Sequence, residues 1–147
     1  MTQTVRYQKL DERAVTPHYG SEAAAGADLY AVMDEPLTLQ PGQTVLVHTG
    51  LAVEIPAGFV GLVCARSGLA TKRGLAPANK VGVIDADYRG EIMVALHNHS
   101  GEPQTIDLGE RVAQLVLVPY LTAGYVEADS LTDTDRGAGG FGSTGTK

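Results

Sequence analysis

Short apolar segments alternate with turn-forming residues along most of the chain, and no segment has the length of a long amphipathic helix. Glycine accounts for 18 of the 147 residues, which is roughly 12% where about 7% is usual. Because glycine destabilises helix interiors and favours turns, this frequency argues against long helices. Apolar runs of strand length lie at 44–55, 59–64, 81–84, 91–96 and 111–121. The pattern predicts an all-β sandwich or barrel.

Two pairs of these runs are each joined by a short turn, which predicts two β-hairpins. The first hairpin would pair 44–55 with 59–64 through a Pro-Ala-Gly turn, and the second would pair 81–84 with 91–96. The run 111–121 is nearly all apolar, so it predicts a strand that is buried on both faces.

One short helix is expected to run through residues 69–73. Ser67 could cap its first turn, and Gly74 would end it in the left-handed conformation. A single short helix beside many strands leaves the chain in the all-β class.

The C-terminal segment differs from the rest of the chain. Residues 129–147 contain five glycines and six serine or threonine residues, with only Leu131, Ala138 and Phe141 as apolar side chains. Such a segment buries too little apolar surface to fold alone. The sequence therefore predicts a β domain at 1–128 and a flexible, glycine-rich tail at 129–147.

The chain is acidic, with a formal net charge of −6. A protein of this charge is not expected to bind nucleic acid or anionic membranes broadly. Its single cysteine, Cys64, cannot form an intrachain disulfide, and the N-terminal sequence has no apolar signal core. No run approaches the roughly 18 apolar residues of a membrane span. We therefore expect a cytoplasmic protein with no nucleic-acid and no membrane partner.

Positive charge gathers in one stretch of the chain. Residues 65–84 contain four cations and no carboxylate, and Asp85 follows at once. Cations beside carboxylates in an acidic protein point to a small polyanion that is held with a divalent metal. Within this stretch, Arg66-Ser67-Gly68 offers a guanidinium fork, a hydroxyl and open backbone to a phosphate. A capped helix with a solvated arginine is the structural alternative.

The stretch 79–91 contains the residue types that a nucleoside site needs. Asp85 leaves an apolar strand, where an Asp often caps a turn, and taken alone the residue favours that role; it could also act as a general base that faces a cavity. Exposed strand-edge backbone could read a flat base through its N–H and C=O groups. Tyr88 could pack against a sugar ring and leave no room for a 2′-hydroxyl.

The tail contains a glycine frame whose residues 137–142 match G-x-G-x-x-G literally. A dinucleotide site needs a strand before this motif and a helix after it, and only five residues follow its last glycine. The segment suits a lid instead. In such a lid Phe141 would stack on a base, while Arg136, Ser143 and Thr144 would hold phosphates.

Together these segments resemble the trimeric deoxyuridine triphosphatase (dUTPase) family. Five motifs match in order: AGADL at 25–29, RSGLA at 66–70, Asn79 with GVIDADYRG at 82–90, GERVAQL at 109–115 and RGAGGFGSTG at 136–145. The resemblance implies a jelly-roll-like β-fold and a homotrimer whose active sites use motifs from all three chains. It also implies hydrolysis of dUTP to dUMP and pyrophosphate with Mg²⁺. This activity limits uracil in DNA and supplies dUMP for thymidylate synthesis.

The resemblance assigns roles to individual residues. Asp85 would orient and deprotonate the water that attacks the α-phosphorus, and Asp28 would act on the metal through water. Tyr88 would stack on deoxyribose, and Phe141 would cover uracil. The other substrate-binding residues would be Asn79, Gly82, Val83, Ile84 and Met93 for uracil, and Arg66, Ser67, Gly68, Gln114, Arg136, Gly142, Ser143 and Thr144 for the phosphates and the lid.

One position departs from the family pattern, and two other functions stay open. Many members have Pro before the Arg of the second motif, where this chain has Ala65; the change would loosen the turn without removing a functional group. A dCTP deaminase-like enzyme on the same scaffold is one alternative, although the 84–88 stretch and Phe141 match the hydrolase better. A non-catalytic trimeric regulatory module is the other, and the intact Asp85, Tyr88 and Arg136 argue against it as the only role.

Overall fold

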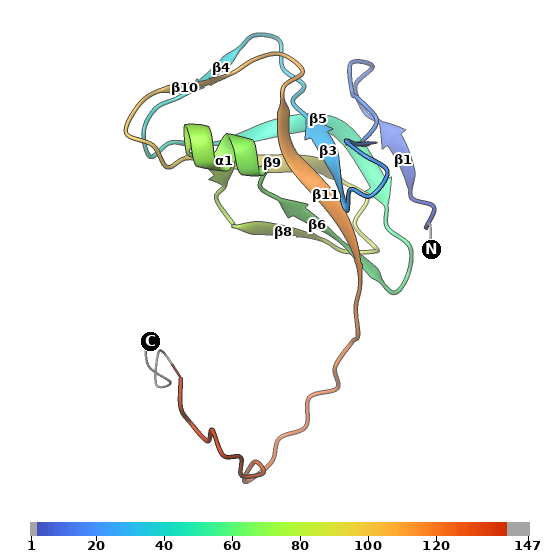
Figure 1. Ribbon diagram of the computed structural model, residues 1–147. Helices are drawn as coiled ribbons and strands as arrows, with labels where there is room; N and C mark the ends of the chain where they lie inside the picture. The colour runs from blue at the N-terminus through green and yellow to red at the C-terminus, as the bar shows by residue number, and fades with distance from the viewer. Residues whose placement is uncertain (1–2, 141–147) are drawn as a thin grey trace.

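Two antiparallel β-sheets and one short helix form the body of the chain in the computed structural model, which describes residues 3–140 (Figure 1). The first sheet has the order β1 (Arg6–Lys9), β5 (Thr44–Glu54), β9 (Glu91–Asn98) and β7 (Leu75–Pro77). The second has the order β2 (His18–Tyr19), β3 (Gly26–Tyr30), β11 (Arg111–Pro119), β6 (Phe59–Cys64) and β8 (Val81–Ile84). β4 (Leu37–Leu39) pairs with β10 (Gln104–Ile106), and α1 (Ser67–Arg73) follows β6. The all-β prediction with one short helix is confirmed.

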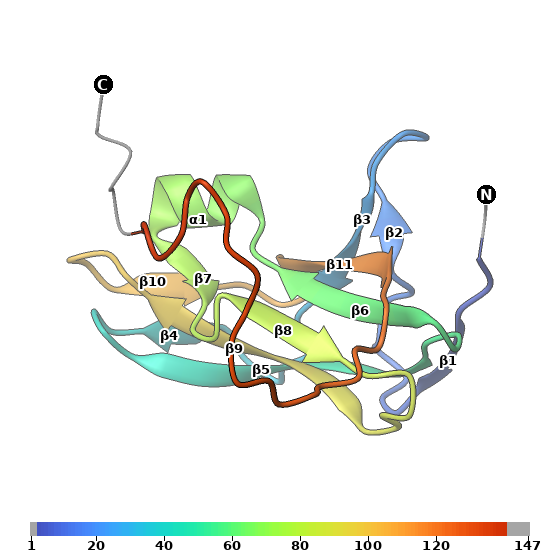
Figure 2. The same cartoon turned by 90° about the horizontal axis from the view of Figure 1, so that it is seen from below.

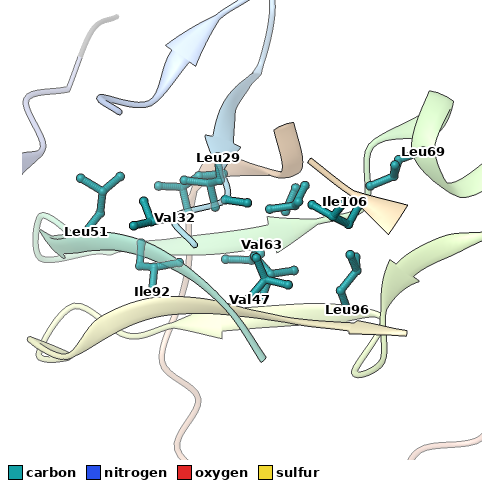
Figure 3. Close-up of a cluster of buried hydrophobic side chains, with 14 of the residues drawn as sticks. Leu29, Val32, Val47, Leu51, Val63, Leu69, Ile92, Leu96 and Ile106 are labelled. Atoms are coloured by element: carbon teal, nitrogen blue, oxygen red, sulfur yellow. The ribbon is translucent and has the colours of Figure 1, made fainter. Parts of the chain in front are cut away.

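An aliphatic core fills the space between the two sheets (Figure 3). In β9, Ile92, Val94 and Leu96 are fully buried, while Met93 points to the other side of the strand. The period-2 alternation of a strand with one buried face produces this pattern. The buried hydrophobic set among residues 3–140 contains no aromatic side chain, so the core depends on close packing of branched aliphatic groups.

The chain changes sheets at both predicted hairpins, and the hairpin prediction is therefore wrong. β5 lies in the first sheet and the following β6 in the second; likewise β8 lies in the second sheet and β9 in the first (Figure 2). The neighbours of β5 are β1 and β9, and those of β6 are β11 and β8. A short turn between two apolar strands serves a crossing between sheets as well as a hairpin, so local sequence cannot separate the two.

The helix α1 ends at Arg73 as predicted, but it begins earlier than predicted. Ser67 is the first helical residue, and Arg66 holds the N-cap position in an extended conformation. The prediction that Ser67 caps the helix is therefore wrong, because Ser67 is itself helical. Within residues 3–140, the Arg66 side chain makes no capping hydrogen bond. Gly74 ends the helix at φ 66° as expected, and a Cβ there would lie 2.9 Å from the Ser100 nitrogen. Only glycine fits that position without strain.

The strand predicted within the run 111–121 is β11, which ends at Pro119. It lies between β3 and β6, and its residues Val112, Ala113 and Leu115 are buried. Beyond it, residues 120–140 form no helix or strand and run away from the sheets (Figure 1). The division into a domain at 1–128 and a tail at 129–147 stays a prediction. Within residues 3–140, no helix is long and apolar enough to cross a bilayer.

We expect Asn98→Ala to lower the free energy of unfolding by about 2–4 kcal/mol, because all four hydrogen-bonding positions of this fully buried amide are used. Its nitrogen donates to the carbonyls of Leu39 (3.0 Å) and Glu102 (2.8 Å), and its oxygen accepts from the Ser100 nitrogen and hydroxyl. Urea unfolding at fixed protein concentration measures the loss. The control is Thr38→Ala, which removes one exposed hydroxyl contact and should change stability by less than about 0.5 kcal/mol. Equal effects of the two substitutions would contradict this account.

Candidate functional site

A cavity of about 300 Å³ opens where β8 of one sheet faces β9 of the other. Its walls come from β5, β6, β7, β8, β9 and the turns beside β8. Six of the predicted substrate-binding residues line it: Asn79, Gly82, Val83, Ile84, Tyr88 and Met93. The sheet change between β8 and β9 creates this cavity, because it leaves the two strands facing each other without pairing.

The backbone of β8 is available to a flat ligand along one edge. β8 is the last strand of its sheet and pairs with β6 on its other side, so within residues 3–140 no strand pairs with this edge. Gly82 lies close to both neighbours, since a Cβ there would lie 3.2 Å from the Val63 Cβ and 3.5 Å from the Asn79 amide nitrogen. Unpaired N–H and C=O groups beside an amide side chain can recognise the edge of a nucleobase.

Tyr88 is held against the start of β9. Its hydroxyl donates to the Glu91 carbonyl at 2.9 Å, and a Cβ on Gly90 would lie only 2.4 Å from the Tyr88 hydroxyl oxygen. Arg89 braces the same turn by donating to the carbonyls of Ala86 (2.7 Å) and Tyr88 (2.9 Å). These contacts give the Tyr88 ring a defined position at the cavity wall.

The Asp85 side chain is exposed at the end of β8. Its main-chain oxygen accepts a hydrogen bond from the Tyr88 N–H at 3.1 Å, which closes the turn. Among the described residues, no hydrogen bond or ion pair involves its carboxylate. A main-chain hydrogen bond thus closes the turn that the Asp85 side chain was a candidate to cap. The carboxylate faces solvent.

A second group of predicted residues gathers around Asp28, which is 8% exposed in β3. Arg66 donates to its Oδ1 at 2.7 Å, and Arg111 donates to its Oδ2 at 3.1 Å. Gln114 lies beside it in β11, in register with both Asp28 and Cys64. The β3–β11–β6 ladder therefore brings together three motifs that are far apart in the sequence.

Gln114 joins this group to the segment before α1. Its amide nitrogen donates to the Ala65 carbonyl at 2.8 Å. Because the bond uses the carbonyl, it does not depend on whether Ala or Pro holds position 65. Gly26 makes room for the amide, since a Cβ there would lie 2.4 Å from the Gln114 oxygen.

The start of α1 is open to a ligand. Ser67 and Gly68 are exposed, and a Cβ on Gly68 would meet no atom of the described residues within 4 Å. Arg66 directs one nitrogen to Asp28, which leaves its other N–H donors for an anion.

The two groups lie at opposite ends of one strand pair. β8 pairs with β6 from Val81↔Cys64 to Ile84↔Gly61, and three strand residues span about 10 Å. Asp85 continues beyond one end, and Arg66 lies beyond the other. One chain therefore does not bring Asp85 beside the Arg66 cluster.

The tail residues are placed only in part. Arg136 is exposed, and its Nε donates to the Gly139 carbonyl at 2.8 Å. Phe141, Gly142, Ser143 and Thr144 lie outside the described residues.

Sequence reasoning gave no role to Arg111, Arg89 or Glu91. All three lie within or beside the matched motifs, but nothing in the pattern tells which side chain faces a carboxylate or a carbonyl. Arg111 is opposite Tyr30, two residues from Asp28 along β3, so its contact with Asp28 could be found only after the strands were matched.

A family model described as dUTPase matches residues 12–145. The chain belongs to the dUTPase family. The match includes all five motifs, so the resemblance seen in the sequence is confirmed over nearly the whole chain.

Curated relatives support the same membership. The deoxyuridine 5′-triphosphate nucleotidohydrolase of Desulfitobacterium hafniense (strain DSM 10664 / DCB-2) is 51% identical, with 96% of this chain and 94% of the relative covered. The enzyme of the same name from Hahella chejuensis is 45% identical, with both chains fully covered.

Solved dUTPases share the fold of this chain. The dUTPase of Staphylococcus bacteriophage 80alpha, solved with dUPNHPP, has a TM-score of 0.85 at 29% identity, with 99% of this chain and 100% of that chain covered. A mutant dUTPase from phage phi11 of S. aureus, described as coordinating a structural Mg(II) ion, has a TM-score of 0.78 at 27% identity, with 89% of this chain and 100% of that chain covered.

We expect Asp28→Asn to lower the free energy of unfolding by about 1–3 kcal/mol, because two guanidinium groups would then face each other without the buried charge between them. Thermal or urea unfolding measures the change. The matched control is Asp34→Asn, since Asp34 also pairs with an arginine but has a side chain that is 92% exposed. The control should change stability by less than about 0.5 kcal/mol. A loss of the same size in both variants would show that burial of Asp28 adds nothing.

Proposed function

We propose that this chain is a dUTP diphosphatase, which hydrolyses dUTP to dUMP and pyrophosphate. Family membership and relatives of this name at 45–51% identity support the activity. The structural observation that supports this activity for the present chain is the cavity beside β8. Its walls include six residues of the predicted nucleoside site. In the cell, the reaction keeps uracil out of DNA and provides dUMP for thymidylate synthesis.

In this proposal the nucleoside enters the cavity. Asn79 and the free edge of β8, from Gly82 to Ile84, recognise uracil, with Met93 at the opposite wall. The Tyr88 ring packs against deoxyribose and leaves no room for a 2′-hydroxyl. The position of the ring supports this selectivity: its hydroxyl is bonded to the Glu91 carbonyl, and it occupies space that a Cβ on Gly90 would fill.

Asp85 acts on the attacking water. Its exposed carboxylate accepts a proton while the water oxygen bonds to the α-phosphorus, and the bond from that phosphorus to the bridging oxygen breaks to release pyrophosphate. A positioned general base contributes about 10²–10⁴-fold to such a step. Phosphoryl transfer depends chiefly on in-line geometry and on neutralised charge.

Arg66, Ser67, Gly68 and Gln114 hold the phosphates, and the Asp28 cluster fits a metal that arrives with them. Residues 3–140 contain no group of three or more His, Cys, Asp or Glu side chains that could hold a metal, whereas Mg²⁺ often binds through substrate phosphates and water with only one or two carboxylates. Each Asp28 oxygen accepts one arginine donor and keeps a lone pair for a metal-bound water. Mg²⁺ on the triphosphate supplies charge neutralisation.

We further propose that the enzyme is a homotrimer with active sites shared between subunits. The separation of Asp85 from the Arg66 cluster within one chain supports this, because a second copy can place its cluster beside the first copy's Asp85. Exposed apolar side chains after β11 also call for cover, since Leu121, Tyr125, Val126 and Leu131 are each at least 88% exposed. The tail of a third copy, residues 129–147, closes over the triphosphate with Phe141 on uracil.

The proposed activity is tested by incubating the protein with dUTP, UTP, dTTP and dCTP in the presence of Mg²⁺. Pyrophosphate should form from dUTP far faster than from the other nucleotides. Ammonia released from dCTP would point to the deaminase instead, and no turnover of any nucleotide would point to a regulatory module.

We expect Asp85→Asn to lower kcat by about 10²–10⁴-fold with little change in the KM for dUTP, because the amide cannot accept the proton from water. Steady-state pyrophosphate release measures both constants. The matched control is Asp87→Asn, an equally exposed carboxylate two residues later in the same turn, which should keep kcat within a few-fold. Near-normal turnover by Asp85→Asn would remove Asp85 as the base.

Deletion of residues 136–147 should lower kcat/KM by about 10²-fold or more, because the phosphates lose Arg136 and the cover of the lid. Stability should change by less than about 0.5 kcal/mol, since residues 120–138 are exposed. Activity and urea unfolding are measured on the same preparations, with deletion of only residues 146–147 as the control. Full activity after the longer deletion would exclude a lid.

A further inference from the structure

Glu91 begins β9 and lines the nucleoside cavity beside Tyr88 and Met93. Its side chain is only 21% exposed and makes two contacts with β5. Oε1 accepts the Gly50 N–H at 2.8 Å, and Oε2 lies 2.9 Å from Nδ1 of His48. The carboxylate thus joins the start of β9 to the neighbouring strand.

The contact falls where the pairing of β5 with β9 is irregular. His48 is opposite Met93 and Ala52 is opposite Glu91, so the register shifts over the residues between them. Gly50 has a φ of 65° inside this bulge, and Thr49 is fully buried and donates its hydroxyl to the Ile92 carbonyl at 2.6 Å. Side chains therefore supply the ties between β5 and β9 at a place where a regular ladder is interrupted.

The main chain of Glu91 is the anchor of Tyr88. The Tyr88 hydroxyl donates to the Glu91 carbonyl at 2.9 Å, and the ring lies against Gly90. Among the described residues, this is the hydrogen bond that the Tyr88 side chain makes. A shift of the Glu91 main chain must therefore move the ring or break its bond.

We propose that Glu91 is a positioning residue for sugar selectivity: its carboxylate ties the start of β9 to the bulge of β5 and thereby sets the position of the Tyr88 ring at the cavity wall. The inference rests on the proposed function, in which Tyr88 packs against deoxyribose. Glu91 does not touch the reacting atoms. It acts through the carbonyl that holds Tyr88, so its loss affects the choice between dUTP and UTP more than the chemical step.

The experiment measures kcat/KM for dUTP and for UTP in the full chain and in Glu91→Ala. The ratio of the two constants should fall about tenfold or more, because a displaced ring admits the 2′-hydroxyl. Glu91→Gln should keep the ratio within about twofold, since its amide oxygen can accept the Gly50 N–H and its amide nitrogen stays within reach of His48 Nδ1. An unchanged ratio in Glu91→Ala overturns the proposal.

Tyr88→Phe provides a second, independent test, because it removes only the bond to the Glu91 carbonyl and keeps the ring. The ratio should fall in this variant, and combining it with Glu91→Ala should cause no further fall, since both remove the same support. Fully additive losses overturn the proposal. If Glu91→Ala does not fold, an unchanged dUTP/UTP ratio in Tyr88→Phe also overturns the proposal.

Glu110→Ala is the matched control for a purely structural role. Glu110 also accepts a main-chain N–H, that of Asp107 at 3.0 Å, and it pairs with Arg73, but it does not line the cavity. This variant should unfold more easily and keep the ratio, because any effect on the shared triphosphate cancels between dUTP and UTP. An equal fall of the ratio in Glu110→Ala and Glu91→Ala would mean that Glu91 only stabilises the fold.

The wild-type measurement distinguishes a failure of the proposed function from a failure of the proposed role of Glu91. If the parent chain does not hydrolyse dUTP, the proposed function fails. If the parent prefers dUTP and Glu91→Ala prefers it equally, only the role of Glu91 fails.

Discussion

Burial of aliphatic side chains between two sheets is the constraint on which the rest of the structure depends. Each sheet has an apolar face that must be covered, and the core of leucine, isoleucine and valine side chains covers both at once. To contribute to both layers, the chain crosses from β5 to β6 and again from β8 to β9. The crossing from β8 to β9 leaves β8 with a free edge and opposes it to Met93 and Glu91 of β9, so the cavity between these strands is a product of core formation.

Ion pairs determine the arrangement of the side chains around Asp28. In this acidic chain, the buried carboxylate of Asp28 holds the side chains of both Arg66 and Arg111. The pair of oxygens on one short side chain fixes two long, flexible cations, which would otherwise lose considerable side-chain entropy on ligand binding. Strand pairing of β3, β11 and β6 then sets Gln114 beside them. A preformed cluster of this kind suits phosphates better than a general excess of positive surface charge.

Local patterns supplied candidate residues for the site but not the neighbours that each candidate has in the fold. The buried and exposed residues alternate in 91–96, and Gly74 ends α1, as predicted. Both features depend only on the local backbone geometry of a few consecutive residues. The two hairpins were wrong because a turn of the same length can stay within a sheet or leave it. Ser67 was wrong as a cap because the chain enters α1 one residue earlier, with Arg66 extended toward Asp28. Sequence patterns assigned no role to three residues whose partners are known only from the structure. Arg89 donates to a main-chain carbonyl, Glu91 accepts the Gly50 N–H, and Arg111 pairs with the Asp28 carboxylate.

By itself, the sequence determined the all-β class, the position of the one helix and the five motifs of the dUTPase family, since turn residues, period-2 alternation and short motifs are local properties of the chain. The tertiary structure decided which strands pair, and therefore that Asn79, Tyr88 and Met93 share a cavity while Arg66, Asp28 and Gln114 form a separate cluster. It also decided that Tyr88 depends on Glu91 and, through its carboxylate, on the bulge of β5. These are long-range contacts, and they follow from how the whole core packs rather than from the residues beside them in the chain.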